Sequence, residues 1–181
     1  MKTRRNFLKR AGLFSAATLL TPQLNLAFPK NSIYGVQLYS FREAMLKNPK
    51  KALETIASLG FKEIESAGSN KGYYYGLSPV KMGETCKALG MTLTSSHVHL
   101  DDKFERTIAD AVASGQEYLI CSSLPSKGQT VDNYKRVAEK FNIAGEACKR
   151  QGLKFGYHNH EYEFESEKGQ ILYDVLMDNT Q

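Results

Sequence analysis

The chain has 181 residues, of which 41% are hydrophobic and 24% are charged, and its formal net charge is +5. This excess is confined to the N-terminus, because no acidic residue precedes Glu43 while five basic residues do within the first ten positions: Lys2, Arg4, Arg5, Lys9 and Arg10. Without them, 19 basic residues stand against 19 acidic ones, and the electrostatic case for a nucleic-acid partner disappears. Three cysteines, without metal-type spacing, argue against a disulfide framework.

The first element is an export signal. The string RRNFLK at residues 4–9 is followed by a moderately apolar stretch at residues 11–20, which is the order of a secretory signal with a twin-arginine head. The apolar stretch is too short to span a bilayer, and no cysteine lies near it to carry a lipid, so no stable membrane anchor is expected. We predict a signal peptide at residues 1–27, cleaved near Leu26-Ala27, and export to the periplasm or beyond.

The rest of the chain, residues 32–181, repeats one pattern in which a helical stretch ends at a glycine and an apolar stretch of strand type follows. Glycine closes helices in the left-handed conformation. Ser78-Pro79 and Thr130 predict two of the helix starts. With an opening strand at residues 33–39, the pattern predicts five strands and at least four helices, and the helix-ending glycines are Gly60, Gly90, Gly115 and Gly152.

Such alternation indicates a parallel sheet covered by helices, either an open doubly wound sheet or part of a closed (β/α)8 barrel. No dinucleotide-binding or phosphate-binding glycine motif follows any strand. Polar residues do collect where the strands end, and active sites of (β/α) barrels lie at that rim. We therefore predict a TIM barrel, and an incomplete one, because only about five of eight βα units are present and residues 169–178 read as the helix after the fifth strand. These rim residues are Gln37, Tyr39, Glu65, His97, His99, Ser122, Ser123, His158, Asn159 and His160.

All four histidines fall in two pairs with i, i+2 spacing. His97 and His99 end the third strand, and His158 and His160 end the fifth. Side chains two apart in a strand point to the same side, so each pair could place two imidazoles together. Imidazole nitrogens suit a divalent ion such as Zn, Mn or Co. We predict His158 and His160 as metal ligands.

Other residues leave alternatives open. Glu65 ends a strand that should be buried, so its carboxylate needs a partner, which could be a metal, a substrate hydroxyl or a lysine. Gln37 could position substrate hydroxyls or cap the following loop. Tyr73, Tyr74 and Tyr75 could stack on the faces of sugars or pack within a surface loop.

Four strings of this sequence together resemble the sugar phosphate isomerase/epimerase family, which has the xylose-isomerase-like (β/α) barrel. They are GVQLYS at residues 35–40, Ile64-Glu65, Ser96-His97 and YHNHEYEF at residues 157–164. The likeness runs from about Ile33 to the end of the chain. It implies an enzyme that interconverts ketose and aldose, or epimers, of a small carbohydrate by moving a proton next to a carbonyl, which a divalent metal (Mn, Zn, Co or Mg) polarises.

The same resemblance implies roles for individual residues. His158 or His160 would stand near the first metal ligand, and Glu163 and Glu65 would lie close to the substrate. The catalytic base would be Glu65, Glu163 or a residue beyond Gln181. His97 matches a histidine that lines the substrate pocket of the family. From their place at the strand ends, Gln37, His99 and Asn159 are also expected to contact the substrate. The other metal ligands of the family, from the sixth to eighth strands, would lie beyond Gln181, which suggests a truncated reading frame.

Two competing functions share this fold. Metal-dependent endonucleases for damaged DNA are disfavoured by the neutral charge and the export signal. A non-catalytic carbohydrate-binding remnant of a barrel is the alternative to the enzyme. The sequence leaves the formation of a homo-oligomer open.

Overall fold

The computed structural model describes residues 33–181, so the predicted signal at residues 1–27 lies outside the described part of the chain. Five parallel strands alternate with helices in the order expected. The strands are β1 (Gly35–Gln37), β2 (Glu63–Ser66), β3 (Thr92–Val98), β4 (Tyr118–Cys121) and β5 (Lys154–Tyr157). The helices between and after them are η1 (Leu38–Phe41), α2 (Arg42–Lys47), α3 (Pro49–Ser58), α4 (Pro79–Ala88), α5 (Phe104–Ser114), α6 (Val131–Arg150), η2 (Glu161–Phe164) and α7 (Leu172–Asp178). Within residues 33–181, no helix has the length and apolar character needed to cross a membrane.

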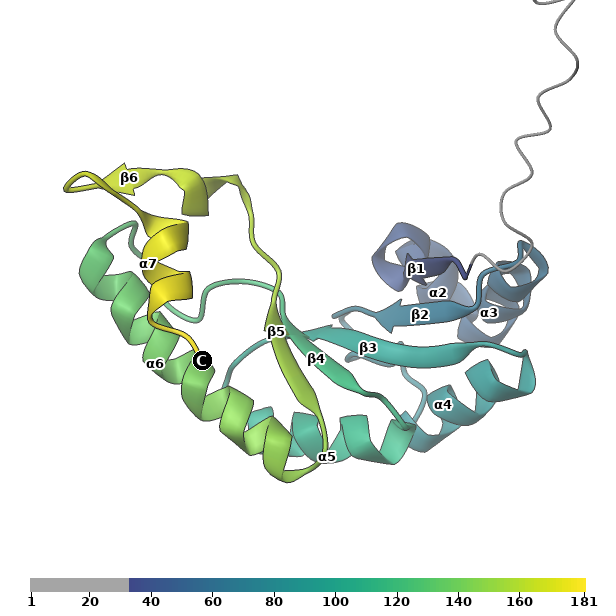
Figure 1. The fold of residues 1–181 in the computed structure, drawn as a ribbon. Helices are drawn as coiled ribbons and strands as arrows, with labels where there is room; N and C mark the ends of the chain where they lie inside the picture. Colours follow the sequence, from purple (N-terminus) through teal and green to yellow (C-terminus); the bar gives the residue numbers. More distant parts are fainter. Residues whose placement is uncertain (1–32) are drawn as a thin grey trace, which may run out of the picture. The chain divides into compact units, whose positions relative to one another are not determined.

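The strand order in the sheet is β1-β2-β3-β4-β5, the same as the order along the chain, and every neighbouring pair is parallel. A doubly wound sheet reverses its strand order at a switch point, and this sheet does not. Figure 1 shows helices α4, α5 and α6 along one side of a curved sheet. The predicted incomplete (β/α) barrel is therefore confirmed.

The core lies between the sheet and the helices that cover it. Ile64 and Leu93 pack with α3 and α4, whereas Leu119 packs with α5 and α6. These side chains leave at most 3% of their surface exposed. Burying one Leu or Ile contributes about 1.5–3 kcal/mol, so this layer holds the five strand ends in register.

The predicted helix ends at glycine and the two predicted helix starts are confirmed. The four helix-ending glycines all have positive φ, from 70° at Gly90 to 94° at Gly60. The hydroxyl of Ser78 accepts the backbone N–H of Lys81 at the start of α4, and Thr130 caps α6 in the same way.

Two predicted elements differ in the structure. The opening strand is shorter than residues 33–39, because the chain turns into η1 at Leu38 and carries Tyr39 out of the sheet. The stretch at residues 169–178 is also only partly helical. A two-residue antiparallel pair, β6 (Ser166–Glu167) with β7 (Gln170–Ile171), precedes α7.

A β-bulge in β3 decides which side chains face the site. Ile64 pairs with Leu93, but the next residue, Glu65, pairs with Ser95, so Thr94 is the extra residue. A bulge changes the alternation of side chains along one strand relative to its neighbour. It places Ser95 on the same face of the sheet as Glu65, and two residues later His97 follows it.

The three cysteines provide a test of this packing. Cys86, Cys121 and Cys148 are all buried free thiols, and burial raises the pKa of Cys86 and Cys148 to about 11. We expect a thiol-specific reagent at pH 8 to label none of them in the native protein and all three in denaturant, because the reactive species is the thiolate. Since the pKa is higher in the folded state, these thiols stabilise the fold fully below pH 9 and lose that contribution as the pH rises from 9 to about 11. Rapid labelling of a thiol under native conditions would contradict the packing.

Candidate functional site

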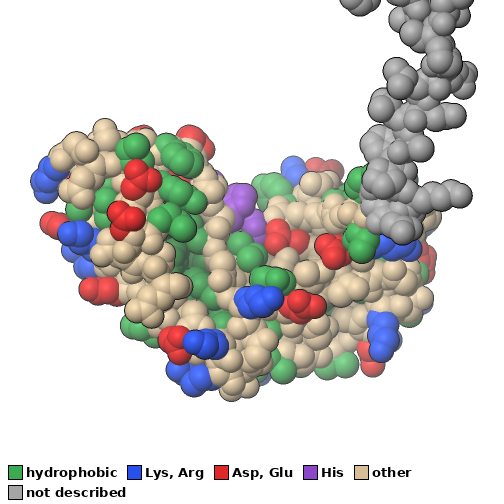
Figure 2. Space-filling model, viewed as in Figure 1, with side chains coloured by type: hydrophobic (Ala, Val, Ile, Leu, Met, Phe, Trp, Pro, Cys, Tyr) green, Lys and Arg blue, Asp and Glu red, His purple; other side chains and the backbone are tan. Residues whose placement is uncertain are grey.

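A cavity of about 890 Å³ opens at the C-terminal ends of the strands. Figure 2 shows histidine side chains beside the hollowed surface of the domain at this end. Of the eight residues predicted for the site, five line the cavity and three do not. Those that line it are Gln37, His97, His99, His158 and His160.

Gln37, Glu65, Ser95 and His97 form one hydrogen-bonded group across three strands. The amide nitrogen of Gln37 donates to Oε1 of Glu65 over 2.6 Å, and the hydroxyl of Ser95 donates to Oε2 over 2.6 Å. Nε2 of His97 lies 3.2 Å from Oε1. Glu65 therefore sits directly behind two residues of the cavity wall, and its partners are polar side chains rather than a lysine.

Burial lowers the pKa of His97, and the neighbouring His158 and His160 act in the same direction, while Glu65 opposes them. His97 is consequently neutral at pH 7. A neutral imidazole can accept a proton, and the carboxylate of Glu65 beside it can stabilise the imidazolium that results.

The loop after β5 brings His158 and His160 to the cavity. The ring of His158 meets the ring of His97 edge to face, with centroids 4.7 Å apart, and lies 5.0 Å from the ring of His160. Both residues lie beyond Tyr157, the last residue of β5, so their positions depend on the loop and not on strand alternation. Asn159 between them is exposed and outside the cavity lining.

Glu163 lies elsewhere than the prediction of a catalytic role requires. It is wholly buried, with 0% of its surface exposed, and is not part of the cavity lining. Its carboxylate accepts hydrogen bonds from the hydroxyl of Tyr157 and, over 2.5 Å, from the backbone N–H of His160. In this arrangement Glu163 holds the histidine loop in place.

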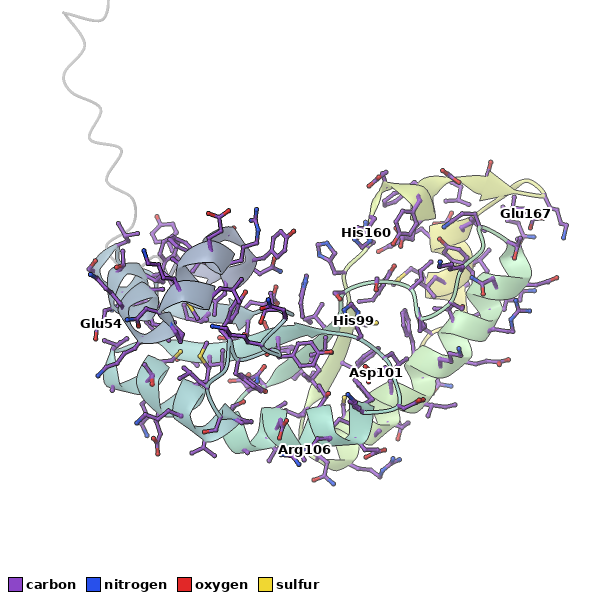
Figure 3. All side chains as sticks on the ribbon, turned by 180° about the vertical axis from the view of Figure 1, so that it is seen from behind. Glu54, His99, Asp101, Arg106, His160 and Glu167 are labelled. Atoms are coloured by element: carbon purple, nitrogen blue, oxygen red, sulfur yellow. The ribbon has the colours of Figure 1, made fainter. Side chains whose placement is uncertain are left out.

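His99 also lines the cavity. Its backbone N–H donates to the hydroxyl of Tyr73 over 3.0 Å, and its Nδ1 lies 3.4 Å from the hydroxyl of Ser122. Figure 3 shows His99 and His160 at the opening, whereas Glu167 lies out on the β6–β7 hairpin. Of the tyrosine triplet, Tyr73 and Tyr74 line the cavity, while Tyr75 is buried; stacking on a sugar stays a prediction.

Sequence reasoning missed Ser95 as a member of the hydrogen-bonded group around Glu65, and it missed the hydrogen bond that Tyr73 accepts from His99. Serine in a strand carries no signal of its own, and only the bulge places Ser95 opposite Glu65. Tyr73 was singled out for its ring, whereas its hydrogen bond to the backbone of His99 depends on the path of the loop after β2.

The predicted metal was tested against the donors that are present. Within residues 33–181, no group of three or more His, Cys, Asp or Glu side chains is arranged to hold a metal ion. Nε2 of His97 already faces Glu65, and Nδ1 of His160 lies 3.0 Å from the hydroxyl of Tyr162. Catalytic zinc sites use three protein ligands, so the described residues do not fit a complete metal site.

Comparison with solved structures places this geometry in context. A sugar phosphate isomerase/epimerase from Parabacteroides distasonis matches 83% of this chain with 26% sequence identity and a TM-score of 0.73. The chain resembles the sugar phosphate isomerases/epimerases. A second protein of that description and organism matches 84% of the chain with 23% identity and a TM-score of 0.71. A D-psicose 3-epimerase crystallised in the presence of D-fructose matches 68% with 17% identity and a TM-score of 0.52.

The chain spans 66% of the length of the two Parabacteroides proteins and 51% of the length of the D-psicose 3-epimerase. No protein-family model matches the sequence, and no curated protein matches it either. The resemblance to a xylose-isomerase-like barrel is thus established by structure, and the two lower-identity likenesses extend to the fold alone.

Proposed function

We propose that the protein is an exported isomerase or epimerase of a small sugar or sugar derivative, acting by proton transfer next to a carbonyl. The observation that carries the proposal is the Glu65–His97 pair at the wall of the strand-end cavity. The 26% identity to a sugar phosphate isomerase/epimerase over 83% of the chain supports the substrate class.

In the proposed reaction, neutral His97 accepts the proton from the carbon next to the carbonyl, and Glu65 stabilises the charge that His97 gains. The electron pair released from that carbon moves onto the carbonyl oxygen, which gives an enediolate. Return of the proton from His97 to the neighbouring carbon, with the hydroxyl hydrogen of that carbon passing to the first oxygen, gives an isomer. Protonation of the original carbon by water on its other face, with loss of the His97 proton to solvent, gives an epimer. Gln37 is held by Glu65 and lines the cavity, so its amide is available to orient a substrate hydroxyl. A positioned acid–base group of this kind contributes about 10²–10⁴-fold to a rate.

The divalent metal (Mn, Zn, Co or Mg) remains part of the proposal, with His158 as the contribution of this segment. A complete set of ligands would need donors other than those that residues 33–181 bring together. No step above depends on the ion.

The test is the exchange of substrate hydrogen for solvent deuterium. The purified full chain is incubated in D₂O with D-fructose or D-tagatose, with Mn²⁺, Zn²⁺, Co²⁺ or Mg²⁺ or with a chelator, and the sugar is analysed by NMR. We expect deuterium next to the carbonyl. Binding of sugar without exchange under every condition would instead support the non-catalytic carbohydrate-binding protein.

Export through the twin-arginine route is tested separately. We expect the wild-type protein in the periplasmic fraction, shortened near Leu26-Ala27, and the Arg4→Lys/Arg5→Lys variant in the cytoplasmic fraction at full length, because the route reads the arginine pair. Intact-mass measurement of both fractions decides between them. Unchanged export of the double variant would exclude this route.

A further inference from the structure

His160 is the N-cap of η2 and is bound to Glu163 in both directions. The backbone N–H of His160 donates to the carboxylate of Glu163 over 2.5 Å, and the His160 imidazole accepts the backbone N–H of Glu163. This reciprocal arrangement is a capping box, in which two backbone donors are satisfied together. Histidine takes the place here of the usual serine or threonine.

The capping box determines which nitrogen of the His160 ring carries the proton. A backbone N–H can only donate, so the ring nitrogen that accepts it must present a lone pair; we assign this acceptor to Nδ1, the ring nitrogen nearest the main chain. The hydroxyl of Tyr162 lies 3.0 Å from the same Nδ1. The carboxylate of Glu163 is 3.9 Å from Nδ1, too far for an Nδ1–H to donate to it. The neutral ring therefore carries its hydrogen on Nε2.

Glu163 is anchored firmly enough to impose this state. A buried carboxylate is stable only when hydrogen bonds replace its water, and the hydroxyl of Tyr157 and the N–H of His160 do so. Burial, reinforced by Glu163, raises the pKa of Tyr157, which keeps this hydroxyl protonated as a donor.

We infer that His160 is a hydrogen-bond donor to a sugar oxygen through its Nε2–H, and that Glu163 is the residue that positions it for this role. His160 lines the cavity, so its outward nitrogen meets the ligand. The inference rests on the proposed function for the identity of the ligand. It replaces the expectation that His160 binds a metal, because a metal ligand needs a free lone pair and the only lone pair of this ring is already used.

The tautomer is measured without sugar or metal. In the full chain labelled with ¹⁵N-histidine, long-range ¹H–¹⁵N correlation at a pH where the rings are neutral should show His160 with its hydrogen on Nε2. Tyr162→Phe should retain this tautomer, because the backbone donor remains. A His160 ring with its hydrogen on Nδ1 would overturn the inference, whatever the enzyme does.

Glu163 variants test the positioning role. Glu163→Gln keeps one acceptor for the His160 N–H and should preserve the Nε2–H tautomer. Glu163→Ala keeps the backbone donor but removes the carboxylate that holds the loop, so the ring should leave the capping position and show a mixture of both tautomers. If Glu163→Ala fails to fold, Tyr157→Phe tests the same role, because it removes the hydroxyl that anchors the Glu163 carboxylate and should likewise give a mixture of tautomers. A pure Nε2–H tautomer in a folded Glu163→Ala variant would show that Glu163 does not position the ring.

Ligand titrations separate the two roles of the ring. We expect Zn²⁺ to leave the Nε2–H of His160 in place and D-fructose to shift its signal; loss of that hydrogen on adding Zn²⁺ would restore the metal role. His160→Ala should raise the Kd for D-fructose about tenfold, the effect of one lost hydrogen bond, and His160→Gln should recover most of it. An unchanged Kd in His160→Ala would contradict the role of His160 as a donor. If the wild-type protein bound no sugar at all, the proposed function would be refuted instead.

Discussion

Glu65→Gln is expected to slow deuterium exchange into the sugar by about 10²–10⁴-fold, which is the usual contribution of a positioned acid–base group. The substitution keeps the size of the side chain and removes the negative charge that lies 3.2 Å from Nε2 of His97. Without that charge, the imidazolium that forms on proton transfer is no longer stabilised. The exchange rate of D-fructose in D₂O, followed by NMR, measures the effect.

Glu63→Gln is the matched control. Glu63 lies two residues earlier on β2, so its side chain is on the same face of the sheet, but it is exposed and belongs neither to the cavity lining nor to the hydrogen-bonded group around Glu65. We expect its exchange rate to remain within about twofold of wild type, as for surface substitutions away from special features. Equal rates for Glu65→Gln and Glu63→Gln would remove Glu65 from the mechanism.

Gly83→Ala is expected to destabilise the fold by about 2–3 kcal/mol, toward the upper end of the cost of overpacking. Gly83 is in the middle of α4, where a Cβ would overlap the backbone carbonyl of Ser114 at the end of α5. A backbone atom cannot move aside as a flexible side chain can, so α4 and α5 would have to separate. Thermal unfolding followed by circular dichroism should show a midpoint lower by about 5–10 °C, at roughly 2–4 °C per kcal/mol for a domain of this size.

Gly145→Ala is the opposite case in the same protein. Gly145 lies within α6, and apart from the adjoining backbone of that helix and its chain neighbours no atom comes within 4 Å of the position that its Cβ would occupy. Alanine should therefore stabilise α6 by about 0.5–1 kcal/mol, the difference in helix propensity. If both substitutions raised the midpoint, the close approach of α4 to α5 would be wrong.

The parts of the fold that depend on local chemistry could be predicted from the sequence. A glycine in the left-handed conformation and a capping side chain both act within a few residues. The four glycines Gly60, Gly90, Gly115 and Gly152 therefore mark four of the helix ends correctly. The β6–β7 hairpin escaped prediction, because its turn at Lys168-Gly169 uses two positive φ angles in a stretch that otherwise reads as helix. The bulge at Thr94 escaped because register depends on the partner strand.

The sequence predicted which residues come together at the site better than it predicted the role of each residue. Strand ends of a parallel sheet meet at one edge, so Gln37, His97 and His158 were expected together and are found together. The role of Glu163 could not be inferred in this way, because its burial depends on Tyr157 and on the turn of η2. The expectation for Glu163 came from the resemblance, and resemblance carries no information on which side of a short helix faces the cavity.

The most direct test of the account is to ask where a sugar binds. All four histidines of the protein line the strand-end cavity, so histidine-selective ¹⁵N labelling of the full chain gives four reporters at the proposed site and none elsewhere. On titration with D-fructose, we predict saturable shifts of the signals of His97, His99, His158 and His160 that follow one binding curve. Calorimetric binding of D-fructose with none of the four signals perturbed would contradict the account, because the sugar would then occupy another part of the protein.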